Sequence, residues 1–195
     1  MSTDAKIQHF WSWFSNHLEL VFRVGTKCSS EKDFVVFEKQ LNELGISCWE
    51  LIGLNIVGET NTFIFSPAGD PAALQLTKKI VRQAPDISGW AFLPAKPPKK
   101  WERRFTWGKA RIPIDASSWK FCVFEYEDGK VDIVLDGNST GHIKTNSLVA
   151  HFVVEAELGE LLYIERVNQV DVENDLSAEL SRVDVDALAG LMKQH

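Results

Sequence analysis

The chain has 195 residues, of which 45% are hydrophobic and 25% are charged, and it carries a formal net charge of −6. A composition of this kind is typical of a folded globular protein and excludes global disorder. The excess of acidic residues argues against a protein that coats nucleic acid or anionic membranes over its whole surface.

The cysteines and the N-terminus predict a cytoplasmic protein. Cys28, Cys48 and Cys122 are widely separated and form no CxxC pair, so no disulfide framework is expected. The first residues, "MSTDAKIQHFWSWF", lack the cationic start and apolar run of a signal peptide. No uninterrupted apolar stretch reaches the length of about 18 residues that a membrane-spanning helix needs.

The first 45 residues are expected to form a pair of helices. In residues 4–24 apolar side chains recur every three or four positions, which is the spacing of one helix face, and Gly25 stands where a C-terminal cap belongs. A second helix is expected to begin after Ser29 or Ser30, either of which can cap it, and to end before Gly45.

The next fifty residues predict the order strand, strand, helix, strand. "ISCWELIGLNIV" and "NTFIFS" have the character of two strands around a "GET" turn. Asp70 can cap a helix whose first position is Pro71, and Pro85 is expected to end that helix. "GWAFLPA" then predicts a short strand.

The same order is expected again after residue 118. "SSWKFCVFEYE" and "KVDIVLD" predict two strands joined by Asp128 and Gly129, which have the composition of a tight hairpin turn. "SLVAHFVVEAEL" predicts a helix, and "GELLYIERVNQVDV" predicts a returning strand. The acidic tail is expected to end in a short helix.

The sequence therefore predicts an α+β fold: an N-terminal helical pair followed by two consecutive ββαβ units with mainly antiparallel sheets. The expected divisions are residues 1–45 (helices packed on the first unit), 46–95 (first ββαβ unit), 96–118 (basic linker with prolines and tryptophans), 119–173 (second ββαβ unit) and 174–195 (acidic tail).

Several short motifs resemble those of a family of uncharacterised bacterial proteins. "FWSWFSNH" near the start, "CWELIG", and "FIFSPAGD" followed by "AP" and "GW" are similar to the family's N-terminal helical pattern and its SPxGD…AP…GW block, and "AELGE" at 156–160 resembles its second half. The resemblance implies an α+β fold and implies no activity or catalytic residue.

One segment stands out for its charge: "KPPKKWERRFTWGKAR", residues 96–111, which we call the basic stretch. It carries seven cations and two tryptophans in an acidic chain. Its cations could contact phosphates and its aromatic rings could stack on bases, which is how proteins grip single-stranded nucleic acid. The candidate nucleic-acid or anion-binding residues are Lys99, Lys100, Trp101, Arg103, Arg104 and Trp107.

A structural role for the basic stretch is the competing interpretation. Because the rest of the chain is strongly acidic, the stretch can settle against acidic groups of its own molecule, and two consecutive prolines stiffen it as a connector. The expected acidic partners lie in the tail: Asp171, Glu173, Asp175 and Glu179.

No catalytic, metal-ligand or cofactor signature is found in the sequence, so no cofactor is expected. The function expected is that of a non-catalytic cytoplasmic interaction or regulatory protein, such as an immunity protein, with another protein as its partner and no membrane contact. Two alternatives stay open: binding of nucleic acid or a phosphate ligand by residues 96–111, and an enzyme with a site between the two units.

Overall fold

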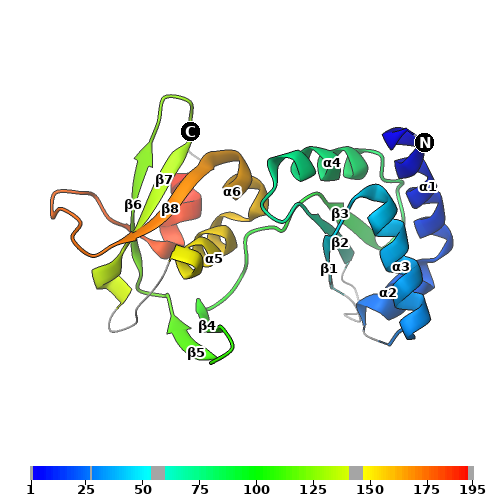
Figure 1. The fold of residues 1–195 in the computed structure, drawn as a ribbon, viewed down its shortest axis with the longest axis horizontal. Helices are drawn as coiled ribbons and strands as arrows, with labels where there is room; N and C mark the ends of the chain where they lie inside the picture. The colour runs from blue at the N-terminus through cyan, green and yellow to red at the C-terminus, as the bar shows by residue number, and fades with distance from the viewer. Residues whose placement is uncertain (1, 27, 54–59, 141–146, 193–195) are drawn as a thin grey trace. The chain divides into compact units, whose positions relative to one another are not determined.

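The computed structural model describes residues 2–26, 28–53, 60–140 and 147–192. Within them the chain forms seven α-helices and three sheets of three, two and four strands, which confirms a mixed α+β fold with N-terminal helices (Figure 1). The chain divides into two compact units, residues 1–96 (unit 1) and 97–195 (unit 2). No helix in these described ranges is long and apolar enough to cross a membrane.

Unit 1 begins with three helices rather than the expected pair: α1 (Thr3–Asn16), α2 (Leu18–Gly25) and α3 (Glu31–Leu44). The first expected helix breaks at His17, whose backbone N–H donates to the carbonyl of Phe14, three residues back, and so closes α1 in a tight turn. The break allows both pieces to bury apolar side chains in one core.

The ends of α3 follow the residues that the sequence indicated. Ser30 accepts a hydrogen bond from the N–H of Asp33 while the Asp33 carboxylate accepts one from the N–H of Ser30, which is a capping box. Gly45 ends the helix at φ 84°, a left-handed conformation that favours glycine.

The three-stranded sheet of unit 1 has the order β1-β2-β3, with β1 (Cys48–Ile52), β2 (Asn61–Ser66) and β3 (Trp90–Leu93). β1 and β2 are antiparallel, whereas β2 and β3 are parallel, because α4 (Pro71–Arg82) crosses over between them. The sheet is therefore mixed, not mainly antiparallel. The expected continuation of the first strand and its turn falls on residues 54–59, outside the described residues.

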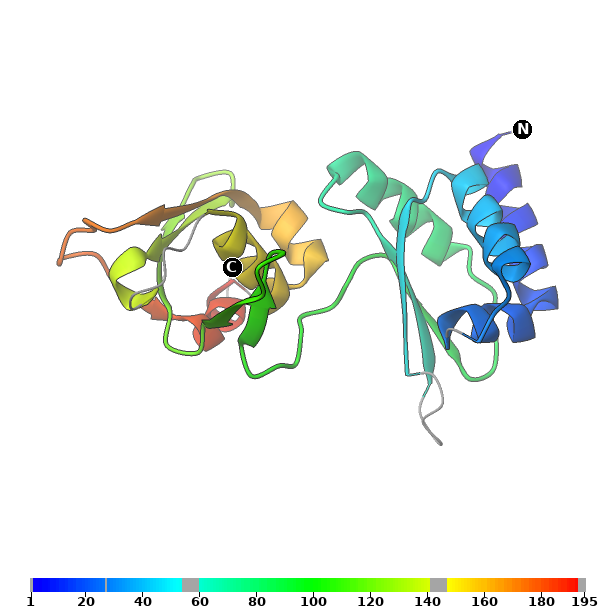
Figure 2. The same ribbon diagram turned by 60° about the horizontal axis from the view of Figure 1, so that its bottom comes forward.

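One face of this sheet packs against the helices, as Figure 2 shows for α1, α2 and α3. The core between them is largely aromatic, with rings meeting edge to face, an arrangement that aromatic quadrupoles favour. The buried indole N–H of Trp11 donates to the carbonyl of Ile80, 3.0 Å away, and so ties α1 to α4. The buried aromatic residues of this core are Phe10, Trp11, Phe14, Phe37, Phe63 and Phe65.

Unit 2 contains a two-stranded and a four-stranded sheet. The small one pairs β4 (Arg104–Trp107) with β5 (Ile112–Asp115), so the residues expected as a linker form a β-hairpin within unit 2. The four-stranded sheet has the order β8-β7-β6-β9, in which only β7 and β8 are parallel. Its strands are β6 (Lys120–Glu125), β7 (Val131–Asp136), β8 (Val167–Glu173) and β9 (Val183–Asp184).

The helices of unit 2 are α5 (Ser147–Leu158), α6 (Glu160–Arg166) and α7 (Leu188–Leu191). The strand expected over residues 159–172 is wrong in its first half, which forms α6. The reason is Gly159: at φ 76° and ψ 152°, which only glycine adopts readily, the chain leaves α5 and starts a new helix. The expected helical end of the tail corresponds to α7.

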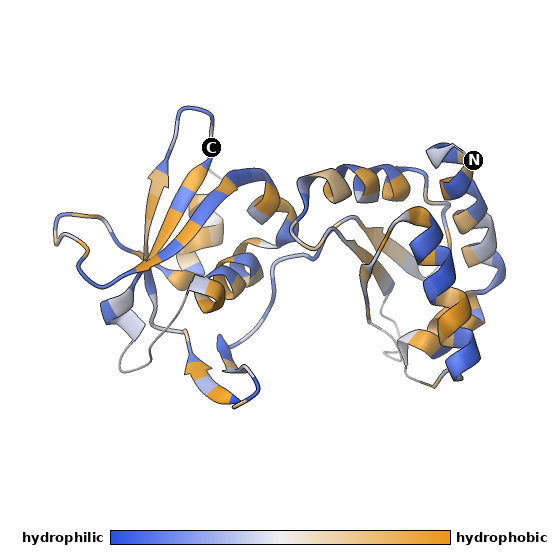
Figure 3. Ribbon diagram, in the orientation of Figure 1, coloured by the Kyte–Doolittle hydropathy of each residue, from blue (hydrophilic) through white to orange (hydrophobic). Residues whose placement is uncertain are grey.

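The core of unit 2 lies between the large sheet and its helices, which Figures 1 and 2 show on one side of β6, β7 and β8. Successive strand residues point to opposite faces, so every second side chain enters this core. On the helices the hydrophobic residues also gather on part of the surface, and Figure 3 shows them as bands along the ribbon. The core includes Trp119, Phe121, Ile133, Leu135, Val153, Val154 and Val170.

Gly159 provides a test of how the basic stretch is seated on unit 2. A Cβ added at Gly159 would lie 2.7 Å from the backbone N and the Cδ of Pro98, and the residue would keep a strained φ. We expect Gly159→Ala to lower the free energy of unfolding of unit 2 by about 1–3 kcal/mol, measured by calorimetry. Gly129→Ala is the matched control, because Gly129 has a similar φ of 77° and no atom lies within 4 Å of its added Cβ. An equal loss of unfolding free energy in both variants would show that Pro98 does not pack against Gly159 as described.

Candidate functional site

The basic stretch is fixed to unit 2 through its backbone before the hairpin begins. The N–H of Lys99 donates to the carbonyl of Ala156, at the end of α5, over 2.7 Å. The carbonyl of Arg103 accepts from the N–H of Ala116, so the hairpin is closed just outside β4 and β5. Residues 97–111 of the stretch are therefore an integral part of unit 2.

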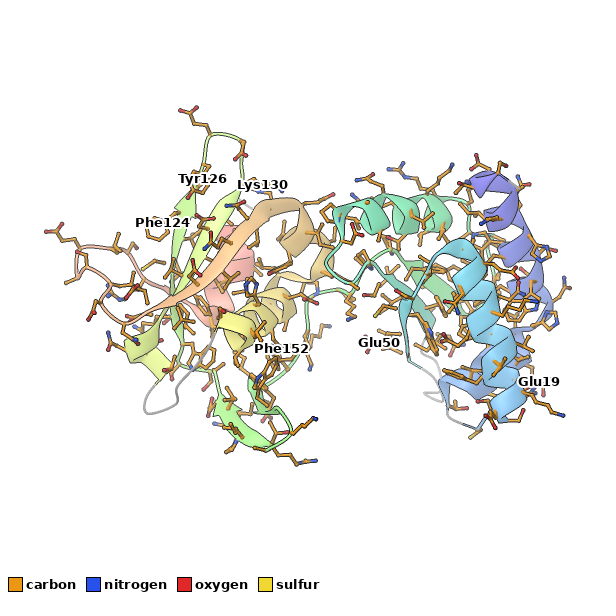
Figure 4. The ribbon with its side chains drawn as sticks, viewed as in Figure 1. Glu19, Glu50, Phe124, Tyr126, Lys130 and Phe152 are labelled. Atoms are coloured by element: carbon orange, nitrogen blue, oxygen red, sulfur yellow. The ribbon has the colours of Figure 1, made fainter. Side chains whose placement is uncertain are left out.

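The aromatic residues of the stretch form a cluster with a ring from α5. The ring centroids of Trp101, Phe105 and Trp107 lie 5.0–5.7 Å from that of Phe152. Figure 4 labels Phe152 on α5. The ammonium of Lys99 lies 4.9 Å from the centre of the Trp101 ring, within reach of a cation–π interaction. These rings pack mainly on one another and stay half-buried, so only part of each is available to a ligand.

A buried carboxylate, Glu157 on α5, holds the stretch in place. Its side chain is 5% exposed, and it accepts hydrogen bonds from the indole N–H of Trp101 at 2.8 Å and from Arg103 Nη2 at 3.0 Å. Arg103 Nε also lies 3.0 Å from Glu157 Oε1, at an angle too poor for a hydrogen bond, so that contact is electrostatic. The charge of Arg103 is thereby neutralised inside the protein.

Arg104 is paired within the hairpin itself. Its Nε donates to Asp115 Oδ2 over 2.8 Å, across the β4–β5 pair. The hydroxyl of Ser117, then Arg104, then the N–H of Ser117 lower the pKa of Asp115 to about 2. Both partners are solvent-exposed, so the guanidinium of Arg104 keeps access to the surface.

The six residues predicted as a binding site thus fall into three groups in the structure: exposed lysines, half-buried tryptophans and arginines that pair with acids. Lys99 and Lys100 are exposed, and Trp101 and Trp107 are half-buried in the aromatic cluster. Arg103 and Arg104 pair with acids of their own unit, as the structural interpretation expected. The expected partners in the tail are wrong, because the pairing acids are Glu157 and Asp115.

Sequence reasoning missed Glu157, although a signal for it was present. The buried positions of α5 recur at the spacing of a helix face: residues 149, 150, 153, 154, 157 and 158. An acid on such a face needs a cation or hydrogen-bond donors, because an isolated buried charge is costly. The basic stretch holds seven cations and could have been recognised from the sequence as the source of that cation.

A second surface lies on unit 2, on the side of the large sheet away from its helices. We call it the outer sheet face. Val123, Ile133 and Val170 enter the core, so their neighbours along each strand point outward. Figure 4 shows its two aromatic residues along β6 and at the turn that follows. The outer sheet face consists of Phe124, Tyr126, Asp132, Val134, Gln169 and Asp171.

Exposed aromatic rings and oriented carboxylates lie next to each other on this face. Phe124 is 36% exposed and Tyr126 is 49% exposed. Asp132 accepts hydrogen bonds from the Tyr126 hydroxyl at 2.5 Å and from Asn168 at 2.9 Å, and both bonds lower the pKa of Asp132. Asp171 accepts one from Gln169. Neutral donors therefore orient both carboxylates without cancelling their charge.

Basic groups flank the outer sheet face. At one end Arg182 donates to Asp136 over 2.6 Å and to three backbone carbonyls. The charge of Arg182 is therefore paired with a carboxylate of the same unit. Lys120 at that end pairs with Asp184. Lys130 lies beside the turn at the other end (Figure 4). The centre of the face, between these groups, is aromatic and acidic.

The described residues hold no group of three or more His, Cys, Asp or Glu side chains placed to bind a metal ion. Among the hollows of the described residues are one of about 190 Å³ next to Lys6 and His9 in unit 1 and one of about 220 Å³ next to Arg166 in unit 2. An open hollow of about 600 Å³ lies on the β4–β5 hairpin and is lined by Arg104, Phe105 and Asp115 among others, so part of the basic stretch borders it.

Comparison with protein-family models, with curated proteins and with solved structures finds no match to this chain. The resemblance to a bacterial family therefore stays a prediction.

The contact with Glu157 makes a prediction about stability. Glu157→Gln leaves Arg103 without its counter-charge in a largely buried position, while Trp101 keeps an acceptor. We expect unit 2 to lose about 2–4 kcal/mol of unfolding free energy, seen as a lower melting temperature in calorimetry. Asp115→Asn, which breaks the exposed pair with Arg104, serves as the control and should have a much smaller effect. A similar loss in both variants would show that burial of Glu157 is not decisive.

Proposed function

We propose that the chain is a non-catalytic cytoplasmic interaction or regulatory protein of the immunity type, which binds another protein through the outer sheet face of unit 2. The supporting observation is that Phe124 and Tyr126 stay exposed on a sheet face that no described helix covers. Large aromatic side chains contribute most to binding when a partner covers them, and they are enriched at protein interfaces.

The chemistry of the face favours a partner surface that carries arginine or lysine. Asp132 and Asp171 are held by neutral hydrogen-bond donors, and no described cation forms an ion pair with either of them. A guanidinium or ammonium from the partner can pair with these carboxylates and stack on the neighbouring rings. Electrostatic attraction of this kind also speeds association and selects against acidic partners.

The test is affinity capture from the native cytosol with the full chain and with surface variants. We expect Phe124→Ala combined with Tyr126→Ala to abolish retention of a protein that the wild-type chain captures, because the exposed rings are lost while the core face of β6 is unchanged. Leu161→Ala is the matched control: Leu161 on α6 is 37% exposed and lies outside the outer sheet face. Capture of the same proteins by all three chains would rule out this surface.

A second candidate is binding of nucleic acid or a phosphate ligand by the basic stretch. It is favoured by the half-buried aromatic cluster, which lies next to the exposed cations of the hairpin. Arg103 no longer belongs to that candidate site, because Glu157 neutralises it. The exposed cations that remain for a ligand, without an ion pair among the described residues, are Lys99, Lys100, Lys109 and Arg111.

Salt dependence separates this candidate from the first. If the basic stretch binds phosphates, binding of single-stranded RNA should weaken steeply as salt rises, because the release of counter-ions into a more concentrated salt solution gains less entropy. Changing these four exposed cations to alanine should abolish the binding. Replacing Lys6, Lys32, Lys39 and Arg82 of unit 1 by alanine gives an equal loss of charge elsewhere and should leave binding in place. Absence of RNA binding at low salt, measured by fluorescence anisotropy, removes the candidate.

A further inference from the structure

The longest strand among the described residues, β8, lies at an edge of its sheet. It has seven residues and pairs with β7 alone, whereas the opposite edge of the same sheet, at β6, pairs with β9 (Figure 1). Natural edge strands are usually short or carry lysine or proline, because their unpaired N–H and C=O groups can pair with another chain. β8 contains neither residue, and its register with β7 is regular from Gln169 to Glu173.

The backbone of β8 is free along this edge. In a strand, hydrogen-bonding groups alternate between the two sides, so part of the N–H and C=O groups of β8 face away from β7. The N–H of Val167 donates to the carbonyl of Tyr163, where α6 ends. In residues 168–173 no backbone hydrogen bond joins β8 to a described residue outside β7. The edge can therefore pair with the backbone of one more strand.

The inner side of the edge is apolar and only partly covered. Val170 is 1% exposed and belongs to the core of unit 2. Val172 points to the same side, opposite the buried Leu135, but it is itself only partly buried. Because β8 is the last strand on this side, apolar side chains of an added strand would lie next to the two valines and extend the core.

The outer side of the edge is acidic. Asp171 and Glu173 stand two positions apart, so they point to the same side, and both are exposed. Asp171 accepts a hydrogen bond from Gln169, and Glu173 accepts from the N–H groups of Asn174 and Asp175. None of the ion pairs between described residues includes either carboxylate. Both charges are therefore available to a neighbouring strand.

These charges determine which strand can bind. Side chains directly opposite each other on neighbouring strands are about 4.5–5.5 Å apart, where opposite charges attract and like charges repel. A second copy of β8 is disfavoured, because each copy brings two carboxylates and no cation. A segment with lysine or arginine at every second position places its cations beside Asp171 and Glu173 and its other side chains beside the valines. Charges that keep acidic strands away from the edge thus attract basic ones.

We propose that β8 binds, as an added strand, an extended segment of a partner protein in which lysine or arginine alternates with apolar residues. Backbone hydrogen bonds along the free edge give affinity for an extended chain, and the alternating side chains give selectivity. This inference rests on the proposed function, because the added strand would belong to the protein that binds the outer sheet face. It specifies the form in which that partner presents its cations.

A synthetic peptide as long as β8, in which lysine alternates with valine, tests the edge by fluorescence anisotropy with the full chain. We expect it to bind, and to bind at least about tenfold more weakly to Asp171→Lys combined with Glu173→Lys, because attraction becomes repulsion. A peptide with glutamate in place of lysine should prefer this variant to the wild type. Changing the exposed Glu19 and Glu43 of unit 1 to lysine is the matched control and should leave binding unchanged. Equal binding by all these chains contradicts the proposal.

Hydrogen exchange followed by mass spectrometry shows whether the peptide pairs as a strand. The lysine–valine peptide should slow amide exchange in residues 168–173. The same peptide with methylated backbone nitrogens keeps its side chains and charges but donates no ladder hydrogen bond, so it should neither bind comparably nor slow exchange. Binding that persists after methylation, or binding without slower exchange in β8, overturns the proposal. So does slow exchange in β8 that grows with protein concentration without peptide, because a second copy then occupies the edge.

The added strand and the proposed function can fail separately. If Phe124→Ala combined with Tyr126→Ala releases a captured protein that Asp171→Lys combined with Glu173→Lys retains, the outer sheet face binds its partner without an added strand. This inference is then wrong, while the proposed function stands. If the peptide slows exchange in β8 but the ring variant retains every captured protein, the edge is confirmed and the proposed surface is wrong. Circular dichroism checks that each variant stays folded.

Discussion

The buried carboxylate of Glu157 is the constraint on which the arrangement of unit 2 depends. A carboxylate that is 5% exposed must be matched by donors or a cation, and in this protein both come from the basic stretch, as Trp101 and Arg103. The same contact brings Trp101 against Phe152 and so assembles the aromatic cluster. One ionised side chain on α5 thereby turns a strongly charged segment into part of a folded unit.

This constraint separates two kinds of cation that look alike in the sequence. Arg103 stabilises the fold and cannot also serve a ligand, because its charge is already neutralised in a largely buried site. Lys100 and Lys109 stay exposed, where a charge costs little and can meet a partner. A count of basic residues therefore overestimates the binding capacity of a segment whenever some of them pair with buried acids of the same chain.

The sequence predicted elements that local residues determine, and it failed where a distant contact decides. The caps at Ser30, Gly45 and Asp70 and the turn at Gly129 depend on neighbouring residues and were found. The break at His17 was missed because burial of both helices in one core overrides the local pattern. The helix after Gly159 was missed because the backbone conformation of Gly159, which packs against Pro98, is not visible in the sequence. The outer sheet face needs strand register, which one sequence does not reveal.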